Sequence, residues 1–289
     1  MTSIVIAAHN EERVIGKCLD ALLAGARPGE LDVIVVANGC TDRTAQVAAA
    51  RSGVRVLKVP EAGKSRALNA GDREATGFPR VYLDADLEAT TEMVQRLCAA
   101  LEDPGSGGPR PLAVAPRRVV DAAGRPRVVR AYFAINSRLP AYRGSLFGRG
   151  MFVLSAEGRA RFGVFPEVVA DDLFVDAQFT AAEKLQVDDV VMRVPAPLRT
   201  RDLVRRLVRV RRGGGALRAS AARGEVTGSV RSSDRWSWLR DVVVPAPWLA
   251  PAAVVYVTVT LVAAALARRG SPQSWERDDS TRQAEAESR

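Results

Sequence analysis

Short apolar runs alternate along the first third of the chain with stretches in which apolar residues recur every three or four positions. The four runs are residues 3–8, 31–36, 54–59 and 81–83. Their β-branched and aromatic side chains favour buried strands. The stretches between them favour helices, one ending near Gly25 and one capped by Thr41. Strands and helices that alternate at these lengths predict a parallel sheet with right-handed crossovers.

The fourth run ends in two aspartates, Asp84 and Asp86. Side chains alternate along a strand, so both carboxylates can face one site at the carboxyl edge of the sheet. Two oxygen donors there suit Mg²⁺ or Mn²⁺, which typically binds substrate phosphates as well. Taken alone, the pair fits a solvated turn after a strand equally well, so the neighbouring motifs decide the interpretation.

Five short motifs stand in the order found in family 2 glycosyltransferases, which the chain resembles. Residues 7–11 (Ala-Ala-His-Asn-Glu) stand where the family usually has Pro-Thr-Tyr-Asn-Glu. Residues 37–42 (Ala-Asn-Gly-Cys-Thr-Asp) stand where it has Asp-Asp-Gly-Ser-Thr-Asp. Residues 64–71 match Lys-x-x-Ala-Leu-Asn-x-Gly, and residues 84–86, the acidic triplet, match the metal-binding Asp-x-Asp. Residues 170–173 resemble the later Glu-Asp motif that supplies the catalytic base.

The resemblance covers roughly residues 2–215 and implies an α/β protein with the GT-A fold, a mainly parallel central sheet and inverting transfer from a nucleotide-sugar donor. It implies that Asp86 ligates a divalent metal, Mg²⁺ or Mn²⁺, while Asp84 shares the ligation or contacts the ribose. It also implies Asp172 as the base that deprotonates the acceptor hydroxyl. The residues alone leave an alternative, in which Asp172 caps a helix beginning near Leu173.

The resemblance also implies contacts to donor and acceptor. The donor-side residues are Ala8, His9, Glu11, Asn38, Lys64, Asp84, Arg209 and Arg212. The acceptor-side residues are Gly148, Gly150 and Asp171. The two glycines belong to residues 144–152, which resemble the acceptor-side glycine segment of the family, and they would let the backbone approach a sugar closely. For His9, Lys64 and the two glycines, ordinary loop, helix-start and turn roles stay open.

The chain departs from the family pattern after the second strand, where Ala37 and Asn38 replace paired acids, one of which commonly reads the uracil ring. An amide can still donate to a ring carbonyl or accept from a ring N–H. The base of the donor, UDP, GDP or dTDP, therefore stays open. In the later motif Asp171 replaces glutamate and is one methylene shorter.

The middle of the chain is less regular. A turn at residues 104–109 precedes a strand over residues 113–120. Tyr132, Phe133 and Tyr142 fit either an acceptor groove or a core. The three cysteines have no metal spacing and indicate reduced thiols.

A basic stretch over residues 199–223 contains arginines at helical spacing, which suit phosphates or anionic lipid head groups. The Gln-x-x-Arg-Trp motif of processive family members is absent, so polymer synthesis is not supported. Residues 242–267 then carry no charge, and this segment is longer than the roughly 20 residues needed to cross a bilayer. Three prolines weaken the first third of this segment, so a regular helix is expected only from about Pro251. A short span, an interfacial helix and a buried core helix all remain open.

The net charge of +9 fits an anionic donor and a negatively charged membrane surface; we expect no nucleic-acid partner. The chain begins with its first strand, without a basic leader, so we expect the catalytic part at the cytoplasmic face of the membrane with a C-terminal anchor. The predicted parts are a nucleotide-sugar-binding half (1–112), an acceptor-side half with the basic segment (113–230), a membrane-associated segment (236–269) and a disordered tail (270–289).

We therefore predict a membrane-associated, metal-dependent, inverting glycosyltransferase of cell-envelope glycan or glycolipid synthesis. Its partners would be a nucleotide-sugar donor and a glycan or lipid-linked acceptor. Two alternatives are a polyprenyl-phosphate glycosyl synthase and a non-catalytic nucleotide-sugar-binding protein.

Overall fold

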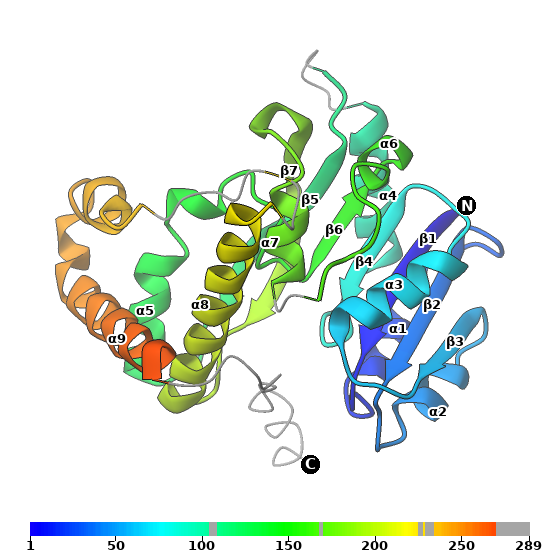
Figure 1. Ribbon diagram of the computed structural model, residues 1–289, viewed down its shortest axis with the longest axis horizontal. Coiled ribbons are helices and arrows are strands. Elements are labelled where there is room, and N and C mark those ends of the chain that lie inside the picture. The colour runs from blue at the N-terminus through cyan, green and yellow to red at the C-terminus, as the bar shows by residue number, and fades with distance from the viewer. Residues whose placement is uncertain (104–108, 168–169, 225–227, 229–233, 270–289) are drawn as a thin grey trace. The chain divides into compact units, whose positions relative to one another are not determined.

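The structure is a computed structural model that describes residues 1–103, 109–167, 170–224, 228 and 234–269 (Figure 1). Its contacts group into two compact units. The first is built mainly from Met1–Arg118 and Gly144–Met192, and the second mainly from Val119–Arg143, Arg193–Glu225 and the C-terminal helices. These units do not follow the division of function predicted above, which stays a prediction. The predicted turn at 104–109 lies almost wholly, and the predicted tail wholly, outside the described residues.

Seven strands form one sheet in the order β3-β2-β1-β4-β6-β5-β7. They are β1 (Thr2–Ala8), β2 (Leu31–Asn38), β3 (Val54–Val59), β4 (Arg80–Asp84), β5 (Ala113–Asp121), β6 (Met151–Leu154) and β7 (Lys184–Pro195). The first four strands are parallel to one another, whereas β6 runs antiparallel to both β4 and β5. The predicted α/β fold with a mainly parallel sheet is confirmed.

Nine α-helices lie within the described residues. They are α1 (Ile15–Leu23), α2 (Thr44–Ala49), α3 (Lys64–Glu74), α4 (Thr91–Glu102), α5 (Arg127–Asn136), α6 (Ala156–Arg159), α7 (Asp171–Asp176), α8 (Thr200–Ala222) and α9 (Ala250–Arg269). Short 3₁₀ turns occupy Pro140–Tyr142, Ala181–Glu183 and Pro247–Leu249, and a π-helical turn occupies Trp238–Val243.

The core of the first unit follows the apolar runs. The side chains of Ile4 to Ile6 in β1 and of Val33 to Val36 in β2 are fully buried. Helix α3 packs against these two strands, where a Cβ on Gly71 would lie only 2.5 Å from Val5 Cγ1. The parallel strands and their connecting helices bring the polar segments after β1, β2 and β4 to one edge of the sheet.

Two helix starts differ from the sequence predictions. Thr41 does not cap the second helix, because α2 begins only at Thr44. Asp42 serves that end instead, since its Oδ1 accepts from the Thr44 backbone N–H at 3.0 Å. Helix α7 begins at Asp171 rather than near Leu173, and Ala170 is its N-cap residue. The predicted helix from about Pro251 is confirmed within one residue by α9.

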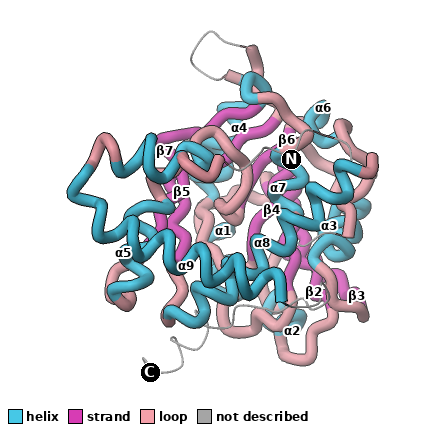
Figure 2. The backbone as a smooth tube through the Cα atoms, turned by 60° about the vertical axis from the view of Figure 1, so that its left-hand side comes forward, coloured by secondary structure: helices cyan, strands magenta, loops and turns pink. Residues whose placement is uncertain are grey.

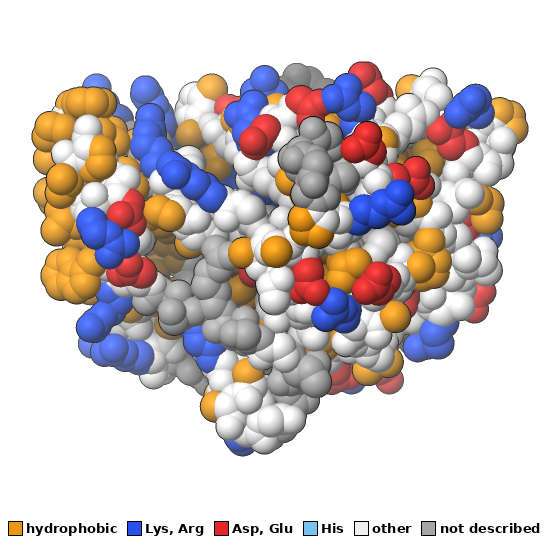
Figure 3. Space-filling view, turned by 90° about the horizontal axis from the view of Figure 1, so that it is seen from above, with side chains coloured by type: hydrophobic (Ala, Val, Ile, Leu, Met, Phe, Trp, Pro, Cys, Tyr) orange, Lys and Arg blue, Asp and Glu red, His pale blue; other side chains and the backbone are white. Residues whose placement is uncertain are grey.

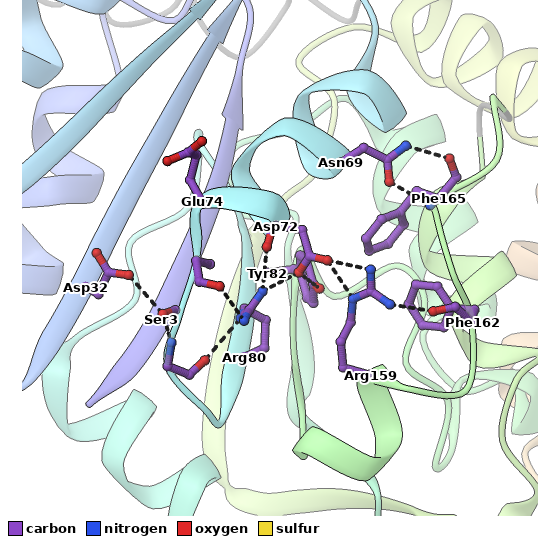
Figure 4. A network of polar contacts seen from close by, with 12 residues as sticks. Ser3, Asp32, Asn69, Asp72, Glu74, Arg80, Tyr82, Arg159, Phe162 and Phe165 are labelled. Atoms are coloured by element: carbon purple, nitrogen blue, oxygen red, sulfur yellow. Dashed lines mark hydrogen bonds and ion pairs between the residues drawn. The ribbon is translucent and has the colours of Figure 1, made fainter.

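A polar network ties α3, β4 and α6 together (Figure 4). The Asp72 carboxylate accepts from Arg80, from the Tyr82 hydroxyl at 2.7 Å and from Arg159. Burial alone would raise the pKa of Asp72, but the bonds from Arg159 and Tyr82 and the two positive charges hold it below its usual value. The ionised network therefore fixes one end of α3, whose other end carries Lys64.

The second unit contains α5, α8 and α9, which lie side by side in both views of the backbone (Figures 1 and 2). Its core joins Val129, Tyr132 and Phe133 of α5 with Leu203 of α8 and Val259 of α9. Tyr132 and Phe133 are therefore core residues. One helix of the described chain, Pro247–Arg269, is long and apolar enough to cross a membrane by length and composition.

Candidate active site

The loops after β1 and β2 are joined by hydrogen bonds. His9 Nδ1 lies 2.6 Å from the backbone oxygen of Asn38, and the Thr41 backbone N–H donates to Asn10 Oδ1 at 2.7 Å. A carbonyl oxygen can only accept, so Nδ1 of His9 carries the hydrogen. The Glu11 backbone N–H donates to Thr44 Oγ1 at 2.6 Å. These bonds give the two loops one fixed arrangement at the sheet edge.

Asn38 is buried at this edge, with 1% of its surface exposed. Its amide donates to the Ala8 carbonyl at 2.8 Å and to the Val36 carbonyl at 3.4 Å, while its Oδ1 accepts from the Gly63 backbone N–H at 2.9 Å. Both amide hydrogens are thus directed to backbone oxygens. The structure shows Asn38 joining β1, β2 and the start of α3, and its predicted contact with a nucleotide base stays a prediction.

Lys64, at the first position of α3, joins two acidic elements. Its Nζ lies 2.8 Å from Asp84 Oδ1 at the end of β4 and 3.0 Å from Asp171 Oδ2 at the start of α7. The Lys64 side chain is 31% exposed and that of Asp84 38%, whereas that of Asp171 is 7% exposed. A positive charge therefore stands between the acidic triplet and the later acidic motif, with one side open to solvent.

The cluster changes the protonation of its members. Burial alone would lower the pKa of Lys64, but the carboxylates of Asp171, Asp84 and Asp172 outweigh it and raise that pKa. Burial raises the pKa of Asp171 to about 6; Lys64 opposes this shift, and the neighbouring carboxylates add to it. Lys64 is therefore charged at neutral pH, and Asp171 exchanges its proton close to neutrality.

Asp172 lies in the first turn of α7, and both of its oxygens accept backbone hydrogen bonds. Oδ2 accepts from the Gly148 N–H at 2.7 Å, and Oδ1 accepts from the Leu173 N–H at 2.8 Å. The first bond connects the glycine segment with the later acidic motif, two predicted acceptor-side regions. Asp172 is not the N-cap residue of α7, although it does satisfy a backbone N–H in its first turn.

Gly150 brings the glycine segment against the acidic triplet. Its φ is +67°, and its carbonyl accepts from the Asp84 N–H at 2.8 Å. A Cβ at this position would lie 2.0 Å from Leu87 Cδ1 and 3.0 Å from Asp84 Oδ2. Only glycine fits both the backbone conformation and the space.

Asp84 and Asp86 meet the usual requirement for a divalent ion bound with a diphosphate. Asp84 ends β4, and Asp86 lies exposed in the turn that follows. Among the residues that the structure describes, no group of three or more His, Cys, Asp or Glu side chains could hold a metal ion. Magnesium commonly binds one or two carboxylates and takes its other oxygens from water and substrate phosphates. The two carboxylates fit this mode of metal binding and not a site in which the protein supplies every ligand.

The first unit brings together most of the predicted site, namely Ala8, His9, Glu11, Asn38, Lys64, Asp84, Asp86, Gly148, Gly150, Asp171 and Asp172. Ala8 and Glu11 are buried, and the Glu11 carbonyl accepts from the first N–H groups of α1. Arg209 and Arg212 belong to α8 in the second unit, so their predicted contact with the donor stays a prediction.

Residues that hold the site in place were missed from the sequence. Arg149, 1% exposed between Gly148 and Gly150, donates to the carbonyls of Ser145 and Pro116 at 2.5 Å each. Its burial, and then the nearby charge of Arg118, lower its pKa to about 10. At the far end of α7, Asp176 accepts from Lys184 at 2.9 Å and from the Leu146 N–H at 2.8 Å. For Arg149, the sequence signal that could have been used is an arginine placed between two glycines.

Residues 3–146 match the family model described as glycosyl transferase family 2. The chain belongs to this family. The matched segment contains the β1, β2, α3 and β4 motifs and ends within the glycine segment. The predicted family is therefore confirmed.

Curated family members match part of their length. The uncharacterized glycosyltransferase EpsJ of Bacillus subtilis (strain 168) is 31% identical over 106 residues, covering 35% of this chain and 30% of that protein. The beta-monoglucosyldiacylglycerol synthase of Synechocystis is 28% identical over 182 residues, covering 59% of this chain and 38% of that protein. This chain thus spans less than two fifths of the matched relatives.

Among solved structures, the mannosyltransferase PcManGT from Pyrobaculum calidifontis, in complex with GDP-Man and Mn²⁺, superposes with a TM-score of 0.57. It is 20% identical in sequence, and the match covers 99% of this chain and 79% of that chain. This similarity establishes the shared fold of the family 2 chain.

Proposed function

We propose that this family 2 protein transfers a sugar from a nucleoside diphosphate sugar to an acceptor hydroxyl, with inversion at the anomeric carbon. The observation that carries the proposal is the Lys64 bridge between Asp84 and Asp171, with Asp172 beside it on α7. It joins a carboxylate suited to the donor diphosphate with a carboxylate pair suited to an acceptor, at the sheet edge where ligands of α/β proteins bind.

Negative charge develops on the leaving diphosphate as the glycosidic bond breaks, and preorganised positive charge lowers that barrier. In our proposal Asp84 and Asp86 hold a divalent ion, Mg²⁺ or Mn²⁺, which supplies Lewis-acid stabilisation when bound. Lys64 adds a fixed positive charge next to Asp84. The solved mannosyltransferase of the same fold also contains Mn²⁺.

The acceptor hydroxyl must lose its proton as the new bond forms, and we assign that proton to Asp172. The bonds from Gly148 and Leu173 hold the carboxylate in one orientation, which supports a positioned base. Asp171 would orient the acceptor through its place beside Lys64. The Gly148–Gly150 turn would let the backbone approach the acceptor closely.

A lipid or lipid-linked acceptor is the narrower form of this proposal. It is supported by the apolar helix Pro247–Arg269, and one curated relative is named a beta-monoglucosyldiacylglycerol synthase. A glycan acceptor would use the same donor chemistry. Nucleotide-sugar donors are cytosolic, so we place the catalytic unit at the cytoplasmic face of a membrane.

A donor panel tests the proposal. Purified protein is incubated with UDP-, GDP- and dTDP-sugars and Mn²⁺, and release of the nucleoside diphosphate is measured. We expect turnover with one nucleotide class and none with the others. If no donor is hydrolysed or transferred, and calorimetry detects no nucleotide binding, the proposal fails. Binding without turnover would leave a non-catalytic nucleotide-sugar-binding protein.

The metal assignment has its own test. Asp86→Ala removes one predicted ligand, so Mn²⁺ should no longer strengthen nucleotide binding in calorimetry. Glu88→Ala is the matched control, since Glu88 is also an exposed carboxylate and lies two residues further on. Unchanged Mn²⁺-dependent affinity in the Asp86 variant would remove this residue from the metal site.

A further inference from the structure

One face of α9 presents an apolar stripe in which the only polar side chain is that of Thr258, whose hydroxyl donates to the Val254 carbonyl at 2.9 Å. Its exposed residues recur every three or four positions, and we call them the α9 apolar face: Pro251, Val254, Thr258, Leu261, Val262, Ala265 and Leu266. Val254 is 67% exposed and Leu261 is 63% exposed. No charged side chain interrupts the stripe before Arg268. A face of this kind on a helix of about 30 Å is unfavourable in water.

The opposite face of α9 is part of the core of the second unit. Ala253, Val259 and Ala263 are buried, and Val259 packs in the cluster that contains Val129 and Leu203. Tyr256 stacks on Tyr132 of α5 with ring centroids 5.2 Å apart. The helix is thus held by packing along one side.

This packing extends over the length of the helix. Near its start, Ala253 lies in a cluster with Ile135 and Val242. Near its end, the guanidinium of Arg212 on α8 donates to the carbonyls of Leu266 and Ala267 at 3.3 and 3.4 Å. A crossing of the bilayer by α9 would therefore carry α5 and α8 into the hydrocarbon.

Helix α8 cannot enter hydrocarbon at low cost, because it contains Arg201, Arg205, Arg206, Arg209, Arg211, Arg212 and Arg218. An arginine at the centre of a membrane-spanning helix costs about 2.5–3.5 kcal/mol even on the mildest scale. The packed arrangement therefore excludes a position in which all of α9 is surrounded by lipid. It allows the apolar face alone to be immersed.

The ends of the apolar face have the chemistry of a membrane interface. Trp248, 75% exposed, lies just before α9, and Trp236, 62% exposed, lies before the preceding π-helical turn. Arg268 and Arg269 are exposed at the other end. Figure 3 shows hydrophobic side chains gathered on the side where α9 lies in Figure 1, with Lys and Arg side chains next to them. Tryptophan prefers the head-group region, and arginine is attracted by anionic lipids.

We propose that the α9 apolar face docks onto an anionic lipid bilayer, with the helix lying in the plane of the interface rather than crossing the membrane. Apolar burial holds the helix at the boundary, and the arginines select anionic head groups. The inference concerns the second unit alone and does not depend on the donor or on the reaction.

Vesicle binding of the full chain tests the docking surface. We expect sedimentation with vesicles of phosphatidylcholine and phosphatidylglycerol, and weaker binding to phosphatidylcholine alone. Val254→Asp should weaken binding by about tenfold or more, since it replaces an inserted apolar group with a charge repelled by the lipid. Val164→Asp is the matched control, because Val164 is also 67% exposed but lies in the first unit. Equal loss in both variants, or no binding by the wild type, would overturn the proposal.

Measurements of how deep positions along α9 lie in the bilayer distinguish a helix in the plane of the interface from a helix that crosses the membrane. Single cysteines replace Val254, Leu261 and Ala265 in a chain with Cys40→Ser and Cys98→Ser, and carry a fluorophore quenched by lipids brominated at known depths. Cys18 can stay, because its burial, with nearby carboxylates, raises its pKa to about 12. An in-plane helix gives one shallow depth at all three positions. Depths that change steadily along the helix would show a span and contradict the proposal.

A second copy of the chain is the other occupant that this face could take. Light scattering after size exclusion, without lipid, should give a monomer. A dimer that Val254→Asp converts to a monomer would assign the face to self-association and overturn the membrane proposal.

Discussion

Replacing Lys64 by methionine tests the electrostatic basis of the site. The variant keeps most of the side-chain volume and removes the charge that bridges Asp84 and Asp171. Breaking a fully buried ion pair costs about 3–5 kcal/mol. The Lys64 side chain is 31% exposed and water screens part of the interaction, so we expect a loss of about 2–3 kcal/mol in unfolding free energy at pH 7.

The loss should depend on pH in a defined sense. Burial raises the folded-state pKa of Asp171 to about 6 against its usual 3.8, so this group favours folding at low pH and loses that contribution as the pH rises through 6. Without Lys64 the folded-state pKa rises further. Below about pH 4 Asp171 is protonated in both proteins, and the difference in unfolding free energy is smallest. It should widen from pH 4 to pH 7.

Urea denaturation followed by circular dichroism measures these values. Tryptophan fluorescence is unsuitable, because Trp236, Trp238 and Trp248, the tryptophans among the described residues, lie outside the unit that contains Lys64. Lys58→Met, at an exposed position on β3, is the control and should leave stability unchanged. The double variant Lys64→Met with Asp171→Asn should recover much of the loss, because no buried charge is left alone. A loss equal at pH 4 and pH 7, or no recovery in the double variant, would refute the reasoning.

Two further predictions concern residues that position the cluster. Gly150→Ala should lower the unfolding free energy by about 1–3 kcal/mol and slow transfer, because an alanine at φ +67° is strained and its Cβ would collide with Leu87 Cδ1. Gly163→Ala is the control, since a Cβ there has open space. Equal unfolding free energies for the two variants would contradict the argument. Asn69→Ala should cost about 1–3 kcal/mol, because the Asn69 amide exchanges two hydrogen bonds with the Phe165 backbone, at 2.8 and 2.9 Å. Limited proteolysis should then cleave the segment before α7 faster than in wild type, and unchanged cleavage would count against this role.

The sequence predicted the elements that depend on local pattern. Strand β3 was predicted at its observed bounds, because its alternating residues and flanking turn signals are local. The collection of the polar loops at one edge of the sheet also followed from the pattern, since parallel strands place their carboxyl ends together. The start of helix α2 was placed two residues early, because its N-cap residue is Arg43 rather than Thr41, and Asp42 accepts from the Thr44 backbone N–H in its first turn.

The contacts between distant segments were not predictable in the same way. Lys64 is 20 residues from Asp84 and far from Asp171 in sequence, so its bridge depends on how α3, β4 and α7 pack. The hydrogen bonds that Asn38 makes to the backbone of Ala8 and Gly63 likewise depend on how β1, β2 and α3 pack. The hydropathy of the apolar segment 242–267 likewise fits a membrane span, an interfacial helix and a core helix, so the sequence does not choose among them.

Transfer by the Asp172→Asn variant tests the central claim most directly. Asparagine keeps the shape of the side chain, but it can accept from only one of the Gly148 and Leu173 N–H groups through its oxygen. The expected cost in stability is about 1–3 kcal/mol, which circular dichroism will detect. Glu157→Gln in the first turn of α6 is the control for a neutralised carboxylate in a short helix of the same unit.

With the donor identified by the panel, initial rates of transfer and nucleotide affinity are measured for both variants and the wild type. A general base predicts nucleotide affinity within a few-fold of wild type and transfer lower by about 10²- to 10⁴-fold for Asp172→Asn. The Glu157 variant should match the wild type. Transfer by the folded Asp172→Asn protein within about threefold of wild type would contradict the account, because the proton of the acceptor hydroxyl would then leave by another route.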